Sequence, residues 1–162
     1  MKNRLIAVLL LAGATMLAQE DHHKTVDARG DHVMGFSHEK TTHHFRIYAD
    51  GGAIEVTTND PKDAGSRDQI RMHLSHIAGM FADGNFKAPM LIHDQVPPGV
   101  PTLERLKTEV IYRYEDTEAG GRVRIATKNK EALSAVHEFL KFQIADHRTG
   151  DTTVITKFET AK

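Results

Sequence analysis

The sequence predicts an α+β domain made of two ββα units, with an antiparallel sheet and two helices packed on one of its faces. Two nearly repeated segments carry this prediction: GGAIEVTTND from Gly51 and GGRVRIATKN from Gly120. Upstream, KTTHHFRIY (40–48) matches KTEVIYRYE (107–115) in its lysine, threonine, aromatic and arginine positions. Downstream, each copy continues into an apolar pattern of helical spacing. Repetition of this kind indicates one supersecondary unit used twice.

The first 18 residues have the pattern of a signal peptide. Lys2 and Arg4 precede the apolar run 5–12, which is too short to span a bilayer, and small residues favour cleavage after Ala18. We therefore expect a periplasmic or secreted protein with no membrane span after cleavage, and the alternative is a short membrane anchor. Residues 19–40 lack a steady periodicity and are expected to form an N-terminal tail and a covering loop.

The remaining residues, 41–162, are numerous enough for a single α+β domain with its own core. Its two repeats span 41–85 and 107–150, and a proline-rich crossover at 86–106 joins them. Because the crossover contains the apolar run 89–92, we expect it to be an ordered segment packed on the domain, with room for one short strand.

The first repeat is predicted to begin with a hairpin over 42–58 that turns at its Gly-Gly pair. A helix follows, with alternative starts at Asp60, before a proline, and at Ser66, where Gln69 completes a capping box. Gly84 is expected to end this helix. Its apolar stripe consists of Ile70, Leu74, Ile77 and Phe81.

The second repeat is predicted to have a hairpin over 108–127 and a helix capped by Asn129. The apolar stripe of this helix consists of Leu133, His137, Leu140 and Ile144. In this register His137 falls where the first helix has Leu74, so we expect it in the core stripe. A short final strand is expected over 152–158.

Composition excludes several classes of function. The formal net charge is −1, and it becomes −3 once Lys2 and Arg4 are removed, so the chain offers no basic surface for nucleic acid. The absence of cysteine excludes disulfides, thiolate metal sites and cysteine nucleophiles. The sequence also lacks G-x-S-x-G, Walker and dinucleotide-binding motifs. Its outstanding bias is its 11 histidines.

The candidate metal ligands are five of these histidines: His43, His44, His73, His76 and His137. Strand alternation turns His43, but not His44, toward the layer of the helices. His73 and His76 are three residues apart, so they share one helix surface. Imidazole suits copper and zinc, and three such ligands with an open position describe a catalytic zinc site.

The same histidines also have an ordinary structural explanation. A histidine such as His137 in an apolar stripe is more often a core residue bonded to a backbone carbonyl than a ligand. The His73-x-x-His76 pair lacks the glutamate of H-E-x-x-H, so the motif is weak. His43 and His44 point to opposite faces, so at most one of them reaches an inward site unless a bulge intervenes. Both explanations remain open at this level.

Weaker candidates lie outside the two helices. Met34 suits copper, or haem as an axial ligand, although a buried methionine is commoner; covalent haem is excluded because there is no C-x-x-C-H. His93 and Asp94 would orient each other, as a ligand with its supporting group or as an acid–base pair, or Asp94 only caps a turn. Glu39 is either a base or a solvated charge.

Four runs carry a resemblance to a known family: MGFSHEKTTHHFRIYADGGAIEV, DQIRMHLSHIAGMF, PMLIHDQVPPGVP and AVHEFLKFQIADHRTGD. They resemble a family of small exported bacterial proteins over nearly all of the chain after the signal peptide. Some relatives are similar to segments beside cytochrome c modules, which implies a periplasmic redox or metal setting. Others carry the label aspartate carbamoyltransferase, but this chain is short for two substrate-binding domains and lacks an S-T-R-T-like phosphate loop.

The function expected from the sequence is the binding of copper or zinc by an exported protein through its histidine cluster, with a redox role as one option. The alternative is a non-catalytic interaction module, in which the histidines are structural and the apolar crossover docks a partner such as a periplasmic electron-transfer protein. A third reading is a small enzyme that uses His93 or Glu39 as a base. The sequence does not indicate the oligomeric state.

The two repeats are expected to divide their labour. The first has His43-His44 where the second, by sequence matching, has Val110-Ile111. Apolar residues only pack, whereas a site needs polar groups that converge. We therefore expect the first repeat to hold most of the site and the second to serve as scaffold that contributes His137.

Overall fold

The structure is a computed structural model that describes Asp21 and residues 24–158. The predicted signal peptide, 1–18, lies outside the described residues. Of the helices within the described part, none is long and apolar enough to cross a membrane.

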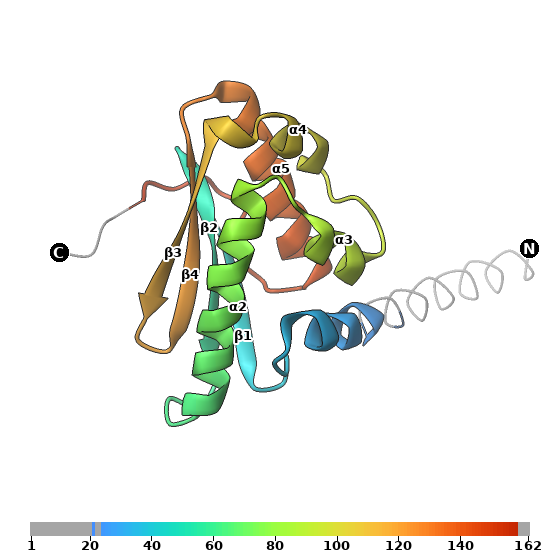
Figure 1. Ribbon diagram of the computed structural model, residues 1–162, viewed down its shortest axis with the longest axis vertical. Helices are drawn as coiled ribbons and strands as arrows, with labels where there is room; N and C mark the ends of the chain where they lie inside the picture. Colours follow the sequence, from blue (N-terminus) through green and yellow to red (C-terminus); the bar gives the residue numbers. More distant parts are fainter. Residues whose placement is uncertain (1–20, 22–23, 159–162) are drawn as a thin grey trace, which may run out of the picture.

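Four antiparallel strands form one sheet, in the order β1-β2-β4-β3 (Figure 1). The strands are β1 (Thr41–Tyr48), β2 (Gly51–Thr58), β3 (Val110–Thr117) and β4 (Gly120–Thr127). Each predicted hairpin is present and closes with a two-residue turn, since Tyr48 pairs with Gly51 and Thr117 with Gly120. The turns are residues 49–50 and 118–119, so the Gly-Gly pairs, expected at the turns, instead begin β2 and β4. The predicted α+β fold with an antiparallel sheet is confirmed.

The central pair of strands shows that the duplication is also a symmetry. Gly51 of β2 pairs with Ala126 of β4, and Thr57 of β2 pairs with Gly120 of β4. A single shift of 69 residues, from 51 to 120 and from 57 to 126, converts one pairing into the other. The two hairpins are therefore related by a pseudo-twofold axis between β2 and β4.

In the structure, the first strands of the two repeats correspond with a shift that differs by two residues from the one that sequence matching gave. His43 pairs with Val56, and the residue paired with the symmetric Ile125 is Tyr112, not Val110. The matching lysine, threonine and arginine positions are thus out of step with the hairpin register. Because side chains alternate with a period of two, this slip leaves the assignment of strand faces unchanged.

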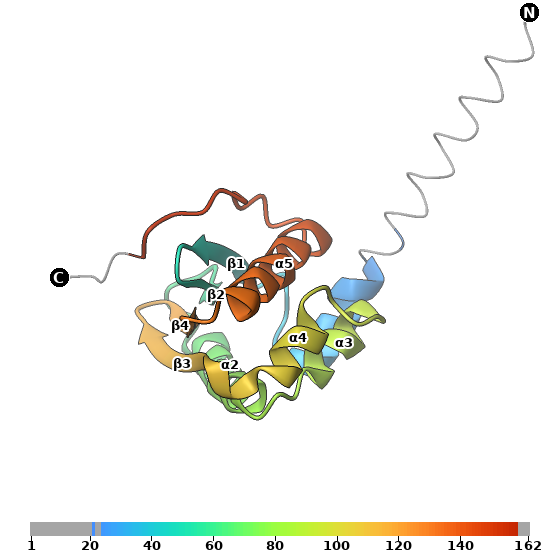
Figure 2. The ribbon, with the colours of Figure 1, turned by 90° about the horizontal axis from the view of Figure 1, so that it is seen from above.

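Two long helices cover the same face of the sheet (Figure 2). These are α2 (Ala64–Ala82), which packs mainly on β3 and β4, and α5 (Lys130–Asp146), which packs mainly on β1 and β2. Each helix therefore lies across the hairpin of the other repeat. Because each ββα unit buries its own helix mainly against the other unit, the two units interlock into one folding domain.

The helix starts follow side-chain capping. Asp63, not Ser66, caps α2: its carboxylate accepts hydrogen bonds from the Ser66 backbone N–H at 2.9 Å and the Ser66 hydroxyl at 2.8 Å. Asn129 caps α5 as predicted, since its Oδ1 accepts from the backbone N–H groups of Glu131 and Ala132. An oxygen at the N-cap satisfies amides that have no partner inside the helix.

The buried stripe of α5 is rotated from the predicted one. Leu133 and His137 are only half-buried. The residues that face the sheet and the neighbouring elements are Ala132, Ala135, Val136, Phe139, Leu140, Gln143 and Ile144. Ala132 and Ala135 have small side chains that let the helix approach its neighbours closely, which the spacing of large residues alone did not show.

The crossover and the N-terminal segment are more helical than predicted. The crossover contains α3 (Lys87–His93) and α4 (Val100–Arg105), followed by the 3-10 turn η1 (Lys107–Glu109), rather than a strand. Pro89 and Pro101 lie in the first turns of α3 and α4, where proline removes no helical hydrogen bond. Residues 24–34, expected to be tail and loop, are also helical and lie beside α3 (Figures 1 and 2).

The C-terminal segment crosses β1 without forming the predicted strand. Among the described residues, it bridges the sheet only at Thr156, whose N–H donates to the Ile47 carbonyl at 3.0 Å and whose carbonyl accepts from the Ala49 N–H at 2.9 Å. The buried carboxylate of Asp151 also holds the segment, since it accepts from the Phe45 backbone N–H at 2.9 Å and from Arg46 at 3.0 Å. A side-chain anchor and one bridge thus take the place of a full ladder of backbone bonds.

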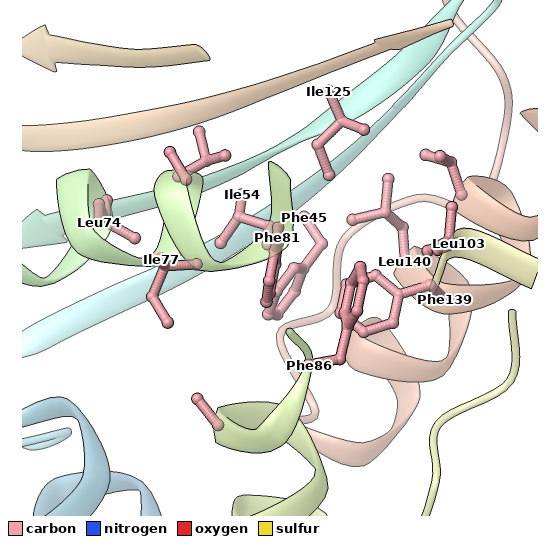
Figure 3. Packing of buried hydrophobic residues seen from close by; sticks show 14 of the residues in the cluster. Phe45, Ile54, Leu74, Ile77, Phe81, Phe86, Leu103, Ile125, Phe139 and Leu140 are labelled. Carbon is pink, nitrogen blue, oxygen red and sulfur yellow. The ribbon is translucent and has the colours of Figure 1, made fainter. Parts of the chain in front are cut away.

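The core lies between the sheet and the helices, where aromatic rings of three elements meet. Phe81 of α2 stacks on Phe86 at 4.4 Å between ring centroids, and Phe139 of α5 meets Phe86 edge-on at 5.9 Å. Figure 3 shows these rings beside Phe45 of β1 and Ile54 of β2. The same layer contains the site described below.

We expect Gly51→Ala to lower the free energy of unfolding by about 3 kcal/mol. A Cβ at Gly51 would lie 2.0 Å from the Ile125 carbonyl oxygen, so β2 and β4 would have to part. Gly79 in α2 is the control, because a Cβ there meets nothing within 4 Å; Gly79→Ala should raise the free energy by about 1 kcal/mol through helix propensity. Urea unfolding measures both, and equal effects at the two sites would contradict this account.

Candidate functional site

The structure places His43 and His137 far apart, although the sequence predicted them in one metal site. The Nε2 of His137 lies 2.9 Å from the Tyr48 carbonyl oxygen, a structural hydrogen bond at the far end of β1. His43 and Tyr48 are five positions apart along an extended strand, which amounts to about 17 Å. His137 therefore takes the ordinary structural role, and it does not share a site with His43.

Two further candidate ligands face away from the helix layer. His44 lies on the opposite face of β1, where its Nδ1 is 2.9 Å from the Asp151 carboxylate. His76 is exposed on α2. In the part of the chain that the structure describes, no three His, Cys, Asp or Glu side chains are placed to hold one metal ion.

His43 and His73 do meet, together with a third imidazole that the sequence did not single out. The Phe36 ring stacks on His43 at 5.9 Å between centroids and meets His73 edge-on at 5.6 Å. On its other side His43 faces His147, just after α5, at 5.9 Å and with the rings 4° from parallel. Strand β1, helix α2 and the end of α5 thus bring three imidazoles to one place.

These imidazoles line an apolar cavity of about 60 Å³, which we call the histidine cavity. Its apolar walls include Phe45, Ile54, Leu74, Ile77, Phe81 and Phe139 (Figure 3). Burial lowers the pKa of His43 and of His73 to about 4, and repulsion between neighbouring imidazoles adds to the effect. Both rings are therefore neutral at pH 7, each with one nitrogen that donates and one that accepts.

His93 forms a second polar centre in the wall of the cavity. Its ring is fully buried, with Nδ1 2.5 Å from Asp146 Oδ2 and Nε2 3.0 Å from Gln143 Oε1. Its sequence neighbour Asp94, the partner considered above, turns outward and pairs with Arg29 at 3.2 Å. The positive φ of 55° at Asp94, which ends α3, directs it away from His93.

The amide of Gln143 is buried and only half satisfied. Gln143 is 4% exposed and lines the histidine cavity, and its Nε2 has no hydrogen-bond partner among the described residues. Rotating the amide by half a turn would give His93 a donor and leave the oxygen without a partner instead. In either orientation one polar atom of Gln143, in the wall of the cavity, is left without a partner among the described residues.

A polar chamber of about 350 Å³ adjoins the histidine cavity. The two spaces share Met34, His43 and His147 in their walls. The other polar residues of the chamber are Asp27, His38, Thr41, Thr42, Arg148 and Thr149. Met34, considered above as a soft ligand, therefore lies at the junction of an apolar and a polar space.

The remaining sequence candidates lie outside this site. Glu39 is exposed, and its backbone carbonyl accepts a hydrogen bond from the Asn59 side chain at 3.0 Å. In the apolar crossover, Pro89 and Ile92 are buried against the domain, whereas Leu91 is 63% exposed. The crossover thus contributes mostly to the core and to the wall of the cavity.

Sequence reasoning missed Gln143, His147 and Arg148. One signal was available for two of them: Gln143 and His147 are four residues apart, so they lie on one side of the helix, and Gln143 interrupts an otherwise apolar stripe. Arg148 had no such signal, because its direction depends on how the chain leaves the helix.

A comparison of the chain with models of protein families, with curated proteins and with solved structures gives no match.

Proposed function

We propose that the protein binds a small organic ligand whose slender apolar part enters the histidine cavity while its polar part lies in the chamber. The half-satisfied amide of Gln143 carries this proposal. A buried polar group without a partner costs about 1–3 kcal/mol, and a ligand that bonds to it recovers that cost. An apolar pocket with a few converging polar groups is the usual form of a ligand site.

The size of the two spaces supports the same proposal. The cavity of about 60 Å³ is much smaller than the engineered apolar cavity of about 150 Å³ that accepts benzene. An aromatic ring therefore does not fit the inner space without movement, whereas a narrow alkyl chain does. The chamber, at about 350 Å³, has the volume expected for the polar part of a small ligand.

Copper binding is a second candidate, favoured by the donors at the junction. Met34, His43 and His147 line both spaces, and a thioether with two imidazoles is a donor set that suits copper. The low pKa of His43 leaves its nitrogen free of a competing proton at neutral pH. Copper uptake that Met34→Leu abolishes and His137→Leu leaves intact would favour this candidate over the organic ligand.

Two other expectations have less support. An electron-transfer partner docked on the crossover would find few apolar anchors there, chiefly Leu91 and Val96, which is 51% exposed. A periplasmic or secreted location remains our proposal from the signal-peptide pattern alone.

The proposed function predicts that 1-hexanol binds to the purified protein and that His73→Phe abolishes this binding. The phenyl ring replaces an imidazole in the wall and fills part of the cavity, whose lining also includes Phe139 of α5. His76→Phe, one helical turn away and exposed, is the matched control and should bind as the wild type does. Saturation-transfer NMR detects the weak binding.

Two results would contradict the proposal. One is the absence of any hexanol signal with the wild-type protein. The other is equal binding by wild type and His73→Phe, with both proteins folded by circular dichroism, which would place the alcohol elsewhere on the surface.

A further inference from the structure

The chain leaves α5 in a conformation that its sequence disfavours. Arg148 has φ of 51°, the left-handed region that glycine usually occupies just after a helix. The backbone bonds of this turn are complete, since Arg148 N–H donates to Ala145 at 3.4 Å and Thr149 N–H donates to Ile144 at 3.3 Å. The nearest glycine, Gly150, comes two residues later. An arginine is therefore held where glycine would cost less.

The position of Arg148 places an arginine in the wall of the polar chamber. Its guanidinium has no hydrogen bond or ion pair with any described residue. Arg148 follows directly after His147, which borders both the histidine cavity and the chamber. Strained backbone conformations of this kind persist at sites where a side chain must be held in place.

The other charged groups of the chamber wall are few. His38 is paired with Asp31, its Nδ1 2.9 Å from the carboxylate. Burial lowers the pKa of His38, but this hydrogen bond and the charge of Asp31 outweigh burial, so the pKa is raised overall. Asp27 contributes one carboxylate to the wall. Among the described residues of the wall, Arg148 is thus the permanent cation, and Asp27 carries the opposite charge.

We infer that the ligand is a small aliphatic carboxylate, whose chain enters the histidine cavity and whose carboxylate pairs with Arg148 in the polar chamber. The inference rests on the proposed function and adds the charge and the orientation of the ligand. The planar guanidinium matches a carboxylate with two parallel hydrogen bonds. The narrow apolar cavity selects an unbranched chain over a ring.

The test compares hexanoate with hexanamide, which has the same chain and shape without the charge. Wild-type protein should bind hexanoate about tenfold or more tightly than hexanamide, the range expected for a hydrogen-bonded ion pair. Arg148→Gln should remove this preference and leave hexanamide binding unchanged. Asp27→Asn is the control with the opposite expected effect. Asp27 and hexanoate are both negatively charged, so removing the Asp27 charge should strengthen hexanoate binding. Titrations by NMR at constant salt measure each of these affinities.

The outcomes separate this inference from the proposed function. If hexanoate, hexanamide and hexanol all fail to bind, the proposed function fails and the inference fails with it. If hexanamide and hexanol bind as tightly as hexanoate, and Arg148→Gln changes nothing, only the carboxylate inference is overturned.

A second variant links the strained turn to binding. Arg148→Gly should raise the melting temperature by about 3 °C, because glycine adopts the left-handed conformation without strain, and it should lose hexanoate preference as Arg148→Gln does. Arg148→Gln keeps the strain, so its melting temperature should equal that of the wild type. A fall in melting temperature with Arg148→Gly would show that the arginine is retained for stability and would overturn the inference.

Discussion

Replacing His93 by leucine is expected to lower the free energy of unfolding by about 4 kcal/mol, measured by urea unfolding at pH 7. The ring is 1% exposed and bonds Asp146 through Nδ1 and Gln143 through Nε2. Leucine fills similar space but bonds to neither. The Asp146 side chain, only 13% exposed, would then lose its 2.5 Å contact with the ring, and the amide of Gln143 would lose the hydrogen bond that it makes among the described residues.

A matched control is available in the same helix layer. His137 is half-buried and makes one hydrogen bond to a backbone carbonyl, so His137→Leu should cost only about 1 kcal/mol. A double-mutant cycle between His93→Leu and Asp146→Asn should give a coupling energy of about 2 kcal/mol. A loss for His93→Leu no larger than that for His137→Leu would contradict the central role of the His93–Asp146 pair.

Lowering the pH from 6.5 toward 4.5 is expected to destabilise the protein through His43 and His73. Their pKa is about 4 in the folded protein and 6.5 ordinarily, so between these values the unfolded chain binds protons that the folded chain does not. Stability is then complete above the ordinary value and falls as the pH drops, by up to about 1.4 kcal/mol per pH unit for each ring. Urea midpoints at pH 7, 6 and 5 measure this slope.

Other groups contribute differently to this window. Asp63 and Asp151 have lowered pKa values, so their stabilising effect is lost only below the ordinary carboxylate range. His38 has a raised pKa, so its pairing with Asp31 stabilises the protein below pH 6.5 and opposes the fall. The double variant His43→Phe/His73→Phe should therefore lose most of the pH dependence between 6.5 and 4.5. An unchanged slope in this variant would contradict the assignment.

Local patterns predicted the elements of the two repeats because neighbouring residues decide them. The Gly-Gly pairs follow directly after two-residue turns that leave little choice of register, and the oxygen of Asn129 caps the helix that follows it. The start of α2 was misplaced by three residues, since Asp63 and Ser66 are both suitable N-cap residues and the spacing of apolar residues does not distinguish them.

The predicted cluster of metal-binding histidines does not form as a whole, because its prediction combined positions from different elements. Alternation along β1 correctly placed His43 inward and His44 outward. The meeting of His43 with His137 required the rotation of α5 and its position along β1, and a rotation by one residue took His137 to the Tyr48 carbonyl instead. An error of one residue in a helix turns a side chain by about 100°, enough to remove a ligand from a site.

The sequence by itself determined the duplicated ββα pattern, the antiparallel hairpins and the inward face of β1, because periodicity and turn residues act over short distances. Only the tertiary structure decided that each helix packs on the other repeat's hairpin, that His93 pairs with Asp146, and that Arg148 and His147 border one chamber. These contacts join residues far apart in the chain, and they depend on helix rotation and on a left-handed turn at Arg148. Such features are set by the packing of the whole core, which no local pattern contains.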